Sequence, residues 1–143
     1  MKEKKYQILE HTADIGIKVK GKDLKELFKN AAVAMFDIIV EKKPENTQNG
    51  LDSKKIFIRQ EAQNSEELFI NWLNELLSLS AAKEMIFEDF QINKLDEENL
   101  IAQVRGVDTN KYKVNTEIKA ATYHGLKIEK GSTGWQAEVI FDV

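Results

Sequence analysis

The sequence predicts an α+β fold in which two helices pack on a largely antiparallel sheet. Two stretches carry apolar residues at the spacing of an amphipathic helix. The other structured stretches alternate apolar and polar residues, or are rich in β-branched and aromatic residues, as strands are. Along the chain the order is strands, helix, strand, helix and then strand hairpins. Hairpins join neighbouring antiparallel strands, so this order favours a mainly antiparallel sheet.

The first helix is predicted over about residues 23–40, after two short strands at about residues 6–9 and 15–20. Asp23 can cap its first turn, and Glu26 follows three residues later, which is the spacing of a capping box. One stripe of this helix is apolar and is expected to face the core: Leu24, Leu27, Phe28, Ala31, Met35, Ile38 and Ile39.

The second helix is predicted over about residues 65–83, with Asn64 or Ser65 as its cap. Its apolar stripe, also expected in the core, contains Leu68, Phe69, Trp72, Leu73, Leu76 and Leu77. Its polar residues are expected to face solvent: Asn71, Asn74, Glu75 and Ser78.

Five further strands are predicted, at residues 54–62, 85–95, 99–107, 115–130 and 135–143. The sequence Asp-Glu-Glu separates the second of these from the third, and Gly-Ser-Thr-Gly separates the last two, so both pairs are predicted hairpins. The polar stretch from Glu41 to Lys54 contains the only proline and is predicted to be an exposed loop.

The composition, with 42% hydrophobic and 31% charged residues, is that of a soluble globular protein. Residues 1–143 are expected to form one domain that buries a hydrophobic core. A formal net charge of -3 disfavours a protein that holds nucleic acid over a broad basic face. The absence of cysteine excludes a disulfide scaffold, a thiolate zinc site and thiol catalysis. No apolar run approaches the roughly 20 residues of a membrane span, so the expected location is the cytoplasm, with no membrane partner.

The last predicted strand ends in two carboxylates. Alternation places Trp135, Ala137, Val139 and Phe141 on one face, and Gln136, Glu138, Ile140 and Asp142 on the other. The Asp142 side chain and the terminal carboxylate of Val143 would then be neighbours, and they repel each other unless a cation or a lysine relieves them. If the strand is ordered, they form a ligand pair for a hard cation such as calcium or magnesium. The alternative is a frayed terminus with a solvated aspartate.

The preceding strand carries a lysine and a histidine that could join this site. Alternation places Glu117, Lys119, Ala121 and Tyr123 on one face, and Ile118, Ala120, Thr122 and His124 on the other. Lys119 could neutralise the terminal carboxylates or hold a phosphate, and it could equally be an ordinary exposed strand lysine. His124 could be a base or a ligand, or a hydrogen-bonded structural residue.

The stretch EHTADIG places three polar residues, His11, Thr12 and Asp14, at a strand corner. Taken alone, each has the properties of a turn residue that bonds nearby backbone amides. The chain contains no glycine-rich phosphate loop, HExxH, GxSxG or EF-hand spacing. Composition and spacing therefore lead to an α+β domain with carboxylate clusters at both chain ends, and no further.

Several blocks, taken in order, resemble the archease family. The N-terminal blocks are EHTADIGIKVKG and LKELFKNAAVAMF, the second helix contains ELFINWLNELL, and the closing hairpin contains EIKAATYHGLKI and VIFDV. The resemblance covers nearly the whole chain. It implies an antiparallel α+β fold built from strand-helix-strand-strand units, in agreement with the elements predicted above.

The resemblance also implies a function. Archeases activate the RtcB-type RNA ligase, which acts in tRNA splicing, tRNA processing and RNA repair and attaches GMP to its own histidine, using GTP and a divalent metal. An archease promotes this guanylylation and repeated turnover. The chain is therefore expected to be a protein cofactor of an RNA ligase and not an independent enzyme, and to meet RNA only indirectly, through the ligase.

Carried over by position, the metal site of the family falls on Asp14, Asp142 and Val143. The expected metal is divalent, calcium with magnesium or manganese as alternatives. Lys119 matches the lysine associated with ligase activation, whereas His11 and His124 lie on family-like motif positions and receive no role.

One departure from the family concerns the stretch before EIKAATYH. Lys111 and Tyr112 stand where many relatives carry Arg-His, so any role of that histidine is in doubt here. Two other functions stay open. One is an independent metal-dependent phosphoesterase that uses the two aspartates, and the other is an RNA-binding or chaperone module, which the net charge disfavours.

Overall fold

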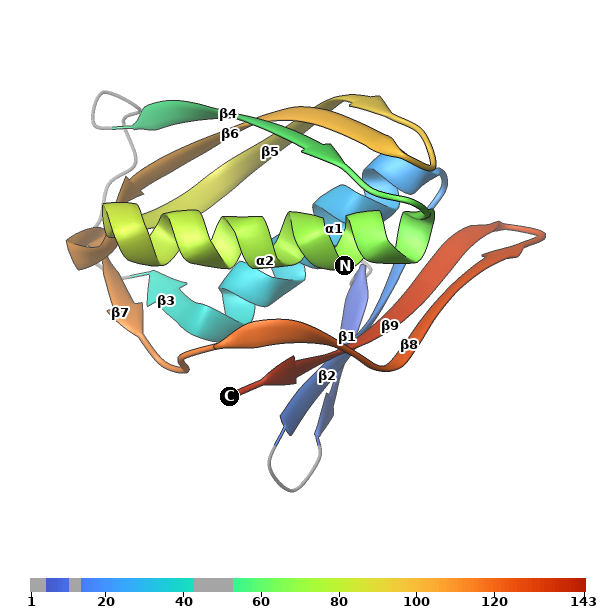
Figure 1. Cartoon of the computed structure of the whole chain (residues 1–143). Coiled ribbons are helices and arrows are strands. Elements are labelled where there is room, and N and C mark those ends of the chain that lie inside the picture. Colours follow the sequence, from blue (N-terminus) through green and yellow to red (C-terminus); the bar gives the residue numbers. More distant parts are fainter. Residues whose placement is uncertain (1–4, 11–13, 43–52) are drawn as a thin grey trace.

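The computed structural model describes residues 5–10, 14–42 and 53–143, which form two α-helices and three antiparallel sheets (Figure 1). The four-stranded sheet has the order β1 (Tyr6–Glu10), β2 (Asp14–Gly21), β9 (Gly134–Asp142), β8 (Ala120–Gly131). The three-stranded sheet has the order β4 (Lys54–Glu61), β6 (Asn99–Asp108), β5 (Met85–Leu95). The predicted antiparallel α+β class is confirmed, whereas the division of the strands among separate sheets is visible only in the structure.

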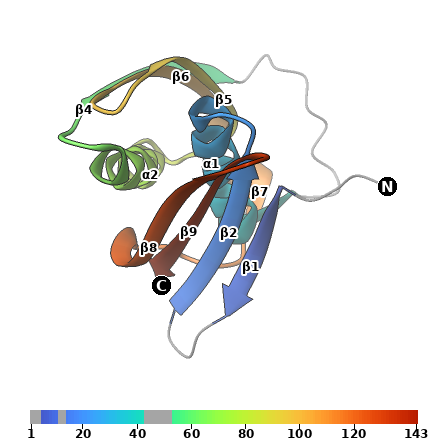
Figure 2. The same cartoon turned by 90° about the vertical axis from the view of Figure 1, so that its right-hand side faces the viewer.

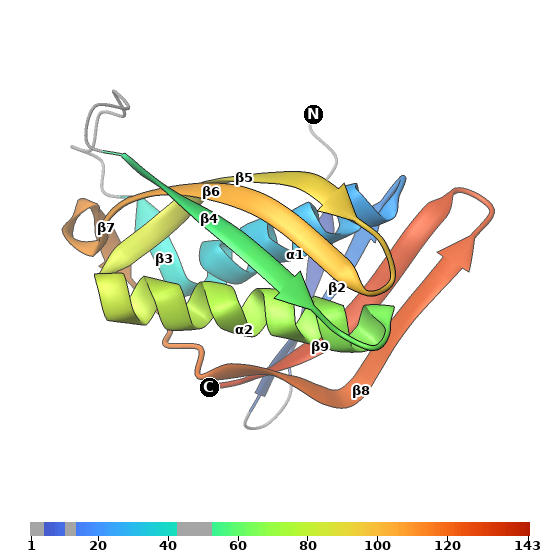
Figure 3. The ribbon, with the colours of Figure 1, turned by 45° about the horizontal axis from the view of Figure 1, so that its top comes forward.

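The helices α1 (Leu24–Ile39) and α2 (Ser65–Lys83) lie between these two sheets (Figures 2 and 3). Both predicted starts are confirmed, because the side chains of Asp23 and Asn64 accept hydrogen bonds from the backbone N–H groups of Glu26 and Glu67. Each helix contacts strands of both sheets, so one hydrophobic core serves all three layers.

The core is centred on the contact between the helices. The Trp72 side chain is fully buried, and its Nε1–H donates a 3.0 Å hydrogen bond to the Phe28 carbonyl. Phe28 packs edge-on against Phe69, with ring centroids 5.1 Å apart. Most of the two predicted apolar stripes is buried, as expected for helices that are covered by sheets on two sides.

Asn74 is an exception to the predicted solvent face of α2. Its side chain is partly buried and bonds both backbone groups of Ala121: Nδ2 donates to the carbonyl at 3.1 Å, and Oδ1 accepts from the N–H at 2.7 Å. The prediction was wrong because β8 packs against this part of α2, and helical periodicity cannot show that a polar residue has a backbone partner in another element.

A short third sheet was not predicted. It pairs β3 (Val40–Lys42) with β7 (Tyr112–Val114), and a 3-10 turn, Thr109–Lys111, precedes β7. Each strand has three residues, which is too short for an alternation pattern to be detected. Residues 41, 42 and 54 of the predicted loop therefore belong to strands, and residues 43–52 lie outside the described part of the chain.

The predicted strand over residues 115–130 begins only at Ala120. The N–H groups of Asn115 and Thr116 both donate to the Ile39 carbonyl, so this segment bonds to the end of α1 instead of forming a ladder. Ile118 and Ala121 are both buried, which contradicts the predicted alternation across residues 117–124. Alternation requires extended ladder geometry, and the ladder is absent before Ala120 and shifts in register between Thr122 and Lys127.

The two predicted hairpin turns are confirmed. The Asp96 carboxylate accepts from the backbone N–H groups of Glu98 and Asn99, both at 2.8 Å, at the turn between β5 and β6. Ser132 and Thr133 form the two-residue connection between β8 and β9. In the described part of the chain, neither helix is long and apolar enough to cross a membrane.

Candidate functional site

The candidate site lies at the end of the four-stranded sheet where β2 begins and β9 ends. Asp14 is the cross-strand partner of Asp142, so the two aspartates predicted from opposite ends of the chain are direct neighbours. Residues directly opposite each other in an antiparallel pair have Cβ atoms about 4.5–5.5 Å apart and point to the same face. Figure 2 shows the C-terminus beside the beginning of β2.

The alternation of β9 decides which face carries the aspartates. Ala137, Val139 and Phe141, which were predicted to share one face, are buried, so Asp142 points to the outer face of the sheet, where it is exposed. Asp14 shares that face and is partly buried. Two carboxylates on adjacent strands thus lie on the same face of the sheet. Like charges placed directly opposite each other repel.

Asp142 is bonded on its other side to the start of β8. Ala120 is its cross-strand partner in β8, and the Lys119 N–H donates a 2.8 Å hydrogen bond to the Asp142 carbonyl. The Lys119 side chain is exposed, and within the described ranges its amine forms no ion pair. Lys119 is therefore attached to Asp142 through its backbone, and its side chain is exposed.

Val143 follows directly after β9, and its side chain packs against the hydrophobic core. Its position is therefore determined by core packing on one side and by the Asp142 pairing on the other. The structure brings Asp14, Asp142, Val143 and Lys119 to one corner of the sheet, which we call the acidic corner.

Asn74 is the residue of this corner that sequence reasoning missed. A side-chain amide offers one donor group and one acceptor, and Asn74 uses both on Ala121, two residues after Lys119. This contact connects α2 to the chain where β8 enters the sheet. The signal in the sequence was weak: an asparagine on a helix is ordinarily read as solvent-facing, and its partner is a backbone group that no side-chain pattern reveals.

The described ladder does not bring His124 to the acidic corner. His124 is exposed and lies in the irregular part of β8 between Thr122 and Lys127, beside Gly125, whose φ is 66°. The register places it beyond the Thr122–Ile140 pair, away from Asp142 along the sheet. His11 and its neighbour Thr12 lie outside the described residues.

The segment at Lys111 and Tyr112 has a structural role. The Tyr112 hydroxyl donates a hydrogen bond to the Glu88 carboxylate, and burial together with this carboxylate raises the pKa of Tyr112 well above its usual value. Tyr112 also begins β7, which pairs with β3 after α1. Lys111 and Tyr112 thus lie where β7 is attached to the rest of the fold.

The oxygen atoms of the acidic corner are of the type that binds a hard divalent cation. Asp14 and Asp142 offer carboxylate oxygens and Val143 offers main-chain oxygen, which are the ligand types that calcium, magnesium and manganese accept. Among the described residues, no three His, Asp or Glu side chains come together at a single point. The described acidic side chains of the corner, Asp14 and Asp142, would therefore fill only part of a coordination shell, which for calcium has about six to eight oxygens.

Comparison with known proteins gives the family. The model of the Archease protein family matches residues 6–143. A protein archease of Methanosarcina barkeri is 38% identical over 98% of this chain and 97% of its own length. One from Pyrococcus abyssi is 35% identical, over 98% of this chain and 99% of its own.

Solved structures agree with these sequence matches. The solution structure of Methanobacterium thermoautotrophicum protein 1598 has a TM-score of 0.69 and 26% identity, and covers 99% of this chain and 100% of that one. The crystal structure of an archease from Thermotoga maritima, described as a possible chaperone, has a TM-score of 0.65 at 24% identity over 94% of each chain, and shows the same fold. The resemblance seen in the sequence is confirmed: the chain belongs to the archease family.

Proposed function

We propose that this protein activates an RtcB-type RNA ligase, by promoting guanylylation of the ligase and its repeated turnover in tRNA splicing or RNA repair. The proposal is supported by membership of the archease family and by one structural observation, the pairing of Asp14 with Asp142 across β2 and β9. In this role the protein acts on the ligase, and chemistry on RNA belongs to the ligase.

The acidic corner is the part of the surface that we assign to a divalent metal. Asp14, Asp142 and an oxygen of Val143 would hold the ion, most readily calcium, with magnesium or manganese as alternatives. A bound divalent ion neutralises phosphate charge in nucleotidyl transfer. Asp14, Asp142 and Val143 would supply only some of the ligands, and the remaining positions could be filled by water or by groups of a partner, which suits a helper that works at another protein's active site.

Lys119 is the second element of the proposal. Its exposed amine lies next to the acidic corner because its N–H is bonded to the Asp142 carbonyl. A lysine is a compact point charge that pairs with phosphate oxygens. We therefore assign Lys119 to the ligase–nucleotide interface, where it would orient the phosphates of GTP toward the attacking histidine of the ligase.

The test is ligase guanylylation with Asp142→Asn, which removes the charge and keeps the shape. We expect activation to fall by at least tenfold, because ion binding and positioning are lost together. The matched control is Asp89→Asn, at an exposed strand position on the other large sheet. Thermal unfolding of both variants checks that they are folded. Full activation by folded Asp142→Asn would contradict the proposal.

Metal binding is tested separately, by calorimetric titration of the protein alone with calcium. We expect heat of binding for the natural sequence and for Asp89→Asn, and its loss in Asp14→Asn and Asp142→Asn. This readout needs no ligase, so failure of the metal assignment can be distinguished from failure of the ligase assignment.

A further inference from the structure

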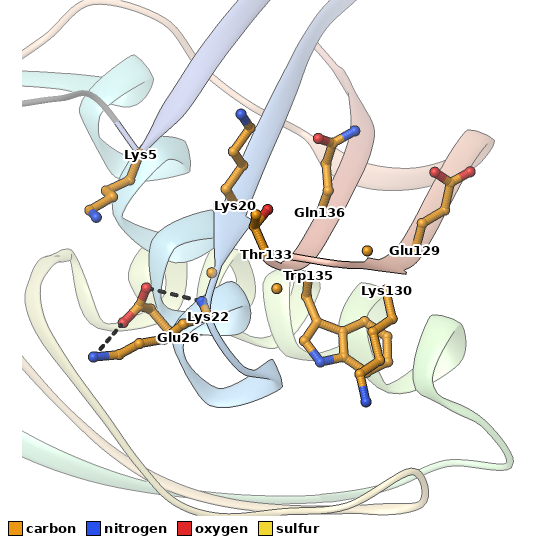
Figure 4. Close-up of a pocket in the computed structure, with 12 residues that line it drawn as sticks. Lys5, Lys20, Lys22, Glu26, Glu129, Lys130, Thr133, Trp135 and Gln136 are labelled. Carbon is orange, nitrogen blue, oxygen red and sulfur yellow. Dashed lines mark hydrogen bonds and ion pairs between the residues drawn. The ribbon is translucent and has the colours of Figure 1, made fainter.

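A second polar site lies at the opposite end of the four-stranded sheet. It is a pocket of about 440 Å³ between the β8–β9 hairpin tip and the corner where β2 leads into α1 (Figure 4). We call it the basic pocket, because its charged lining residues are Lys5, Lys20, Lys22, Lys130, Glu26 and Glu129. Lysines outnumber glutamates by two to one here, in a chain whose formal net charge is -3.

The fold separates this pocket from the acidic corner. Strand β2 runs from Asp14 to Gly21, and the ladder pairs Asp14 with Asp142 at one end and Gly21 with Trp135 at the other. At about 3.3 Å per residue, the two ends are roughly 23 Å apart. The sheet therefore carries negative charge at one end and an excess of positive charge at the other.

Two neighbouring cross-strand rows form the pocket wall. In one row, Lys20 pairs with Gln136, which pairs with Glu129, and in the next row Gly21 pairs with Trp135, which pairs with Lys130. Figure 4 shows the Lys20, Gln136 and Glu129 side chains on one face and those of Trp135 and Lys130 on the other. The lysines thus surround the sheet end instead of forming a single flat stripe.

Two glycines, Gly21 and Gly134, allow a close backbone contact at the pocket. A Cβ atom on Gly134, whose φ is 134°, would lie 2.6 Å from the Gly21 carbonyl oxygen. A Cβ atom on Gly21 would lie 2.4 Å from the Leu27 backbone nitrogen. The hairpin tip can therefore lie directly against the Gly21 backbone, and Gly21 against the first turn of α1, only because both positions lack side chains.

The lysines of the pocket differ in the contacts that they make within the protein. Glu26 forms an ion pair with Lys22, with 3.9 Å between Oε2 and Nζ, and its Oε1 accepts the Lys22 N–H at 3.2 Å. The Lys130 amine lies 5.9 Å from the centre of the Trp135 ring. Lys5 is placed at the pocket by its carbonyl, which accepts the Lys20 N–H at 3.1 Å.

We propose that the basic pocket binds the phosphate backbone of single-stranded RNA. Lysines on flexible stems neutralise successive phosphates without requiring a fixed geometry, and Trp135 adds an aromatic surface of the kind that contacts bases. A site for one particular nucleotide would bring buried polar groups to the base, and the described residues include no buried polar or charged side chain. This binding needs no ligase, so it goes beyond the function proposed above and does not depend on it.

The experiment measures binding of a fluorescein-labelled oligouridine to the protein alone, by anisotropy, over a range of salt. If the four lysines each neutralise one phosphate, affinity falls roughly 50-fold between 50 and 200 mM salt. In Lys20→Gln/Lys130→Gln the same change of salt should weaken binding only roughly sevenfold, because two contacts are lost. The control Lys29→Gln/Lys113→Gln has the same net charge, alters exposed lysines outside the pocket, and should keep the original salt dependence.

Two further readouts locate the binding. Glu129→Gln removes a negative charge from the pocket and should tighten RNA binding severalfold. The chain has two tryptophans, and since Trp72 is fully buried, RNA should quench the fluorescence of Trp135. Equal affinities of the two double variants would overturn the proposal. Binding of GTP or inorganic phosphate with no binding of oligouridine would overturn the assignment to RNA.

Discussion

Asp14 and Asp142 face each other across the β2–β9 ladder, although they belong to opposite ends of the chain. On the far side of β9, the Lys119 N–H bonds the Asp142 carbonyl. One short cross-section of the sheet thus places two carboxylates and the backbone of a lysine side by side. The arrangement has measurable consequences for stability even when no ligase is present.

Removing one of the paired charges should stabilise the metal-free protein. Like charges directly opposite each other in a ladder are destabilising, so Asp14→Asn should raise the free energy of unfolding by up to about 1 kcal/mol at low salt. Urea unfolding in the presence of a chelator measures this change. The gain should shrink as salt is added, since partly exposed charges are screened. Asp89→Asn, which has no carboxylate as its ladder partner, should show no such gain.

With calcium bound, the natural sequence should become more stable than Asp14→Asn. An ion that binds only the folded state adds about 2.7 kcal/mol at a concentration one hundred times its dissociation constant. The midpoint of thermal unfolding should therefore rise with calcium in the natural sequence and stay constant in Asp14→Asn and Asp142→Asn. If calcium raised the unfolding midpoint of both variants as much as that of the natural sequence, calcium would bind elsewhere.

The contact between Asn74 and Ala121 should contribute to both stability and activation. Asn74→Ala leaves the partly buried N–H and carbonyl of Ala121 without these partners, which costs about 1–3 kcal/mol. We also expect weaker ligase activation under conditions where the variant is fully folded, because Lys119 lies two residues from the lost contact. Asn71→Ala, on the same helix, is the control for the loss of a helical asparagine. Unfolding curves and guanylylation rates together separate the two effects.

The hairpin tip at the basic pocket offers a matched pair of glycines. Gly134→Ala should destabilise the protein by more than about 1 kcal/mol, because its φ of 134° is unfavourable for other residues and the new Cβ would meet the Gly21 oxygen. Gly131→Ala should be nearly neutral, since its Cβ would meet only the Gly134 oxygen at 3.8 Å. Chemical denaturation of the two variants checks the difference, and equal losses would contradict this account of the close backbone contact at the pocket.

Stability should fall in alkaline solution because of Tyr6. Its hydroxyl donates a 2.8 Å hydrogen bond to Asp37, and burial together with this carboxylate raises the pKa of Tyr6 to about 12, from an unfolded value of 10.0. A raised pKa means that the stabilisation is complete below pH 10 and is lost as the pH rises toward 12. Tyr6→Phe should be less stable than the natural sequence at neutral pH. Between pH 10 and about pH 12 it should lose less stability than the natural sequence does. Denaturation across this pH range measures the slope.

Local patterns in the sequence were sufficient for most elements. Both helices, their caps and the two hairpin turns follow from apolar spacing, short polar side chains and glycine, which act within a few residues of one another. The failures occur where a distant segment determines the local structure. Residues 115–119 lie outside the β8 ladder, and the N–H groups of Asn115 and Thr116 bond the Ile39 carbonyl at the end of α1. Asn74 is partly covered because β8 packs on α2.

For the candidate site, too, the sequence predicted some features and the tertiary structure was needed for others. The sequence by itself determined the alternation that separates Asp142 from Val139 and Phe141, and the family resemblance that named Asp14, Asp142, Val143 and Lys119. Only the tertiary structure decided that Asp14 and Asp142 are partners and that lysines gather at the other end of the same sheet. Register and strand order depend on pairings between distant parts of the chain, and periodicity within one strand carries no information about which residue lies opposite.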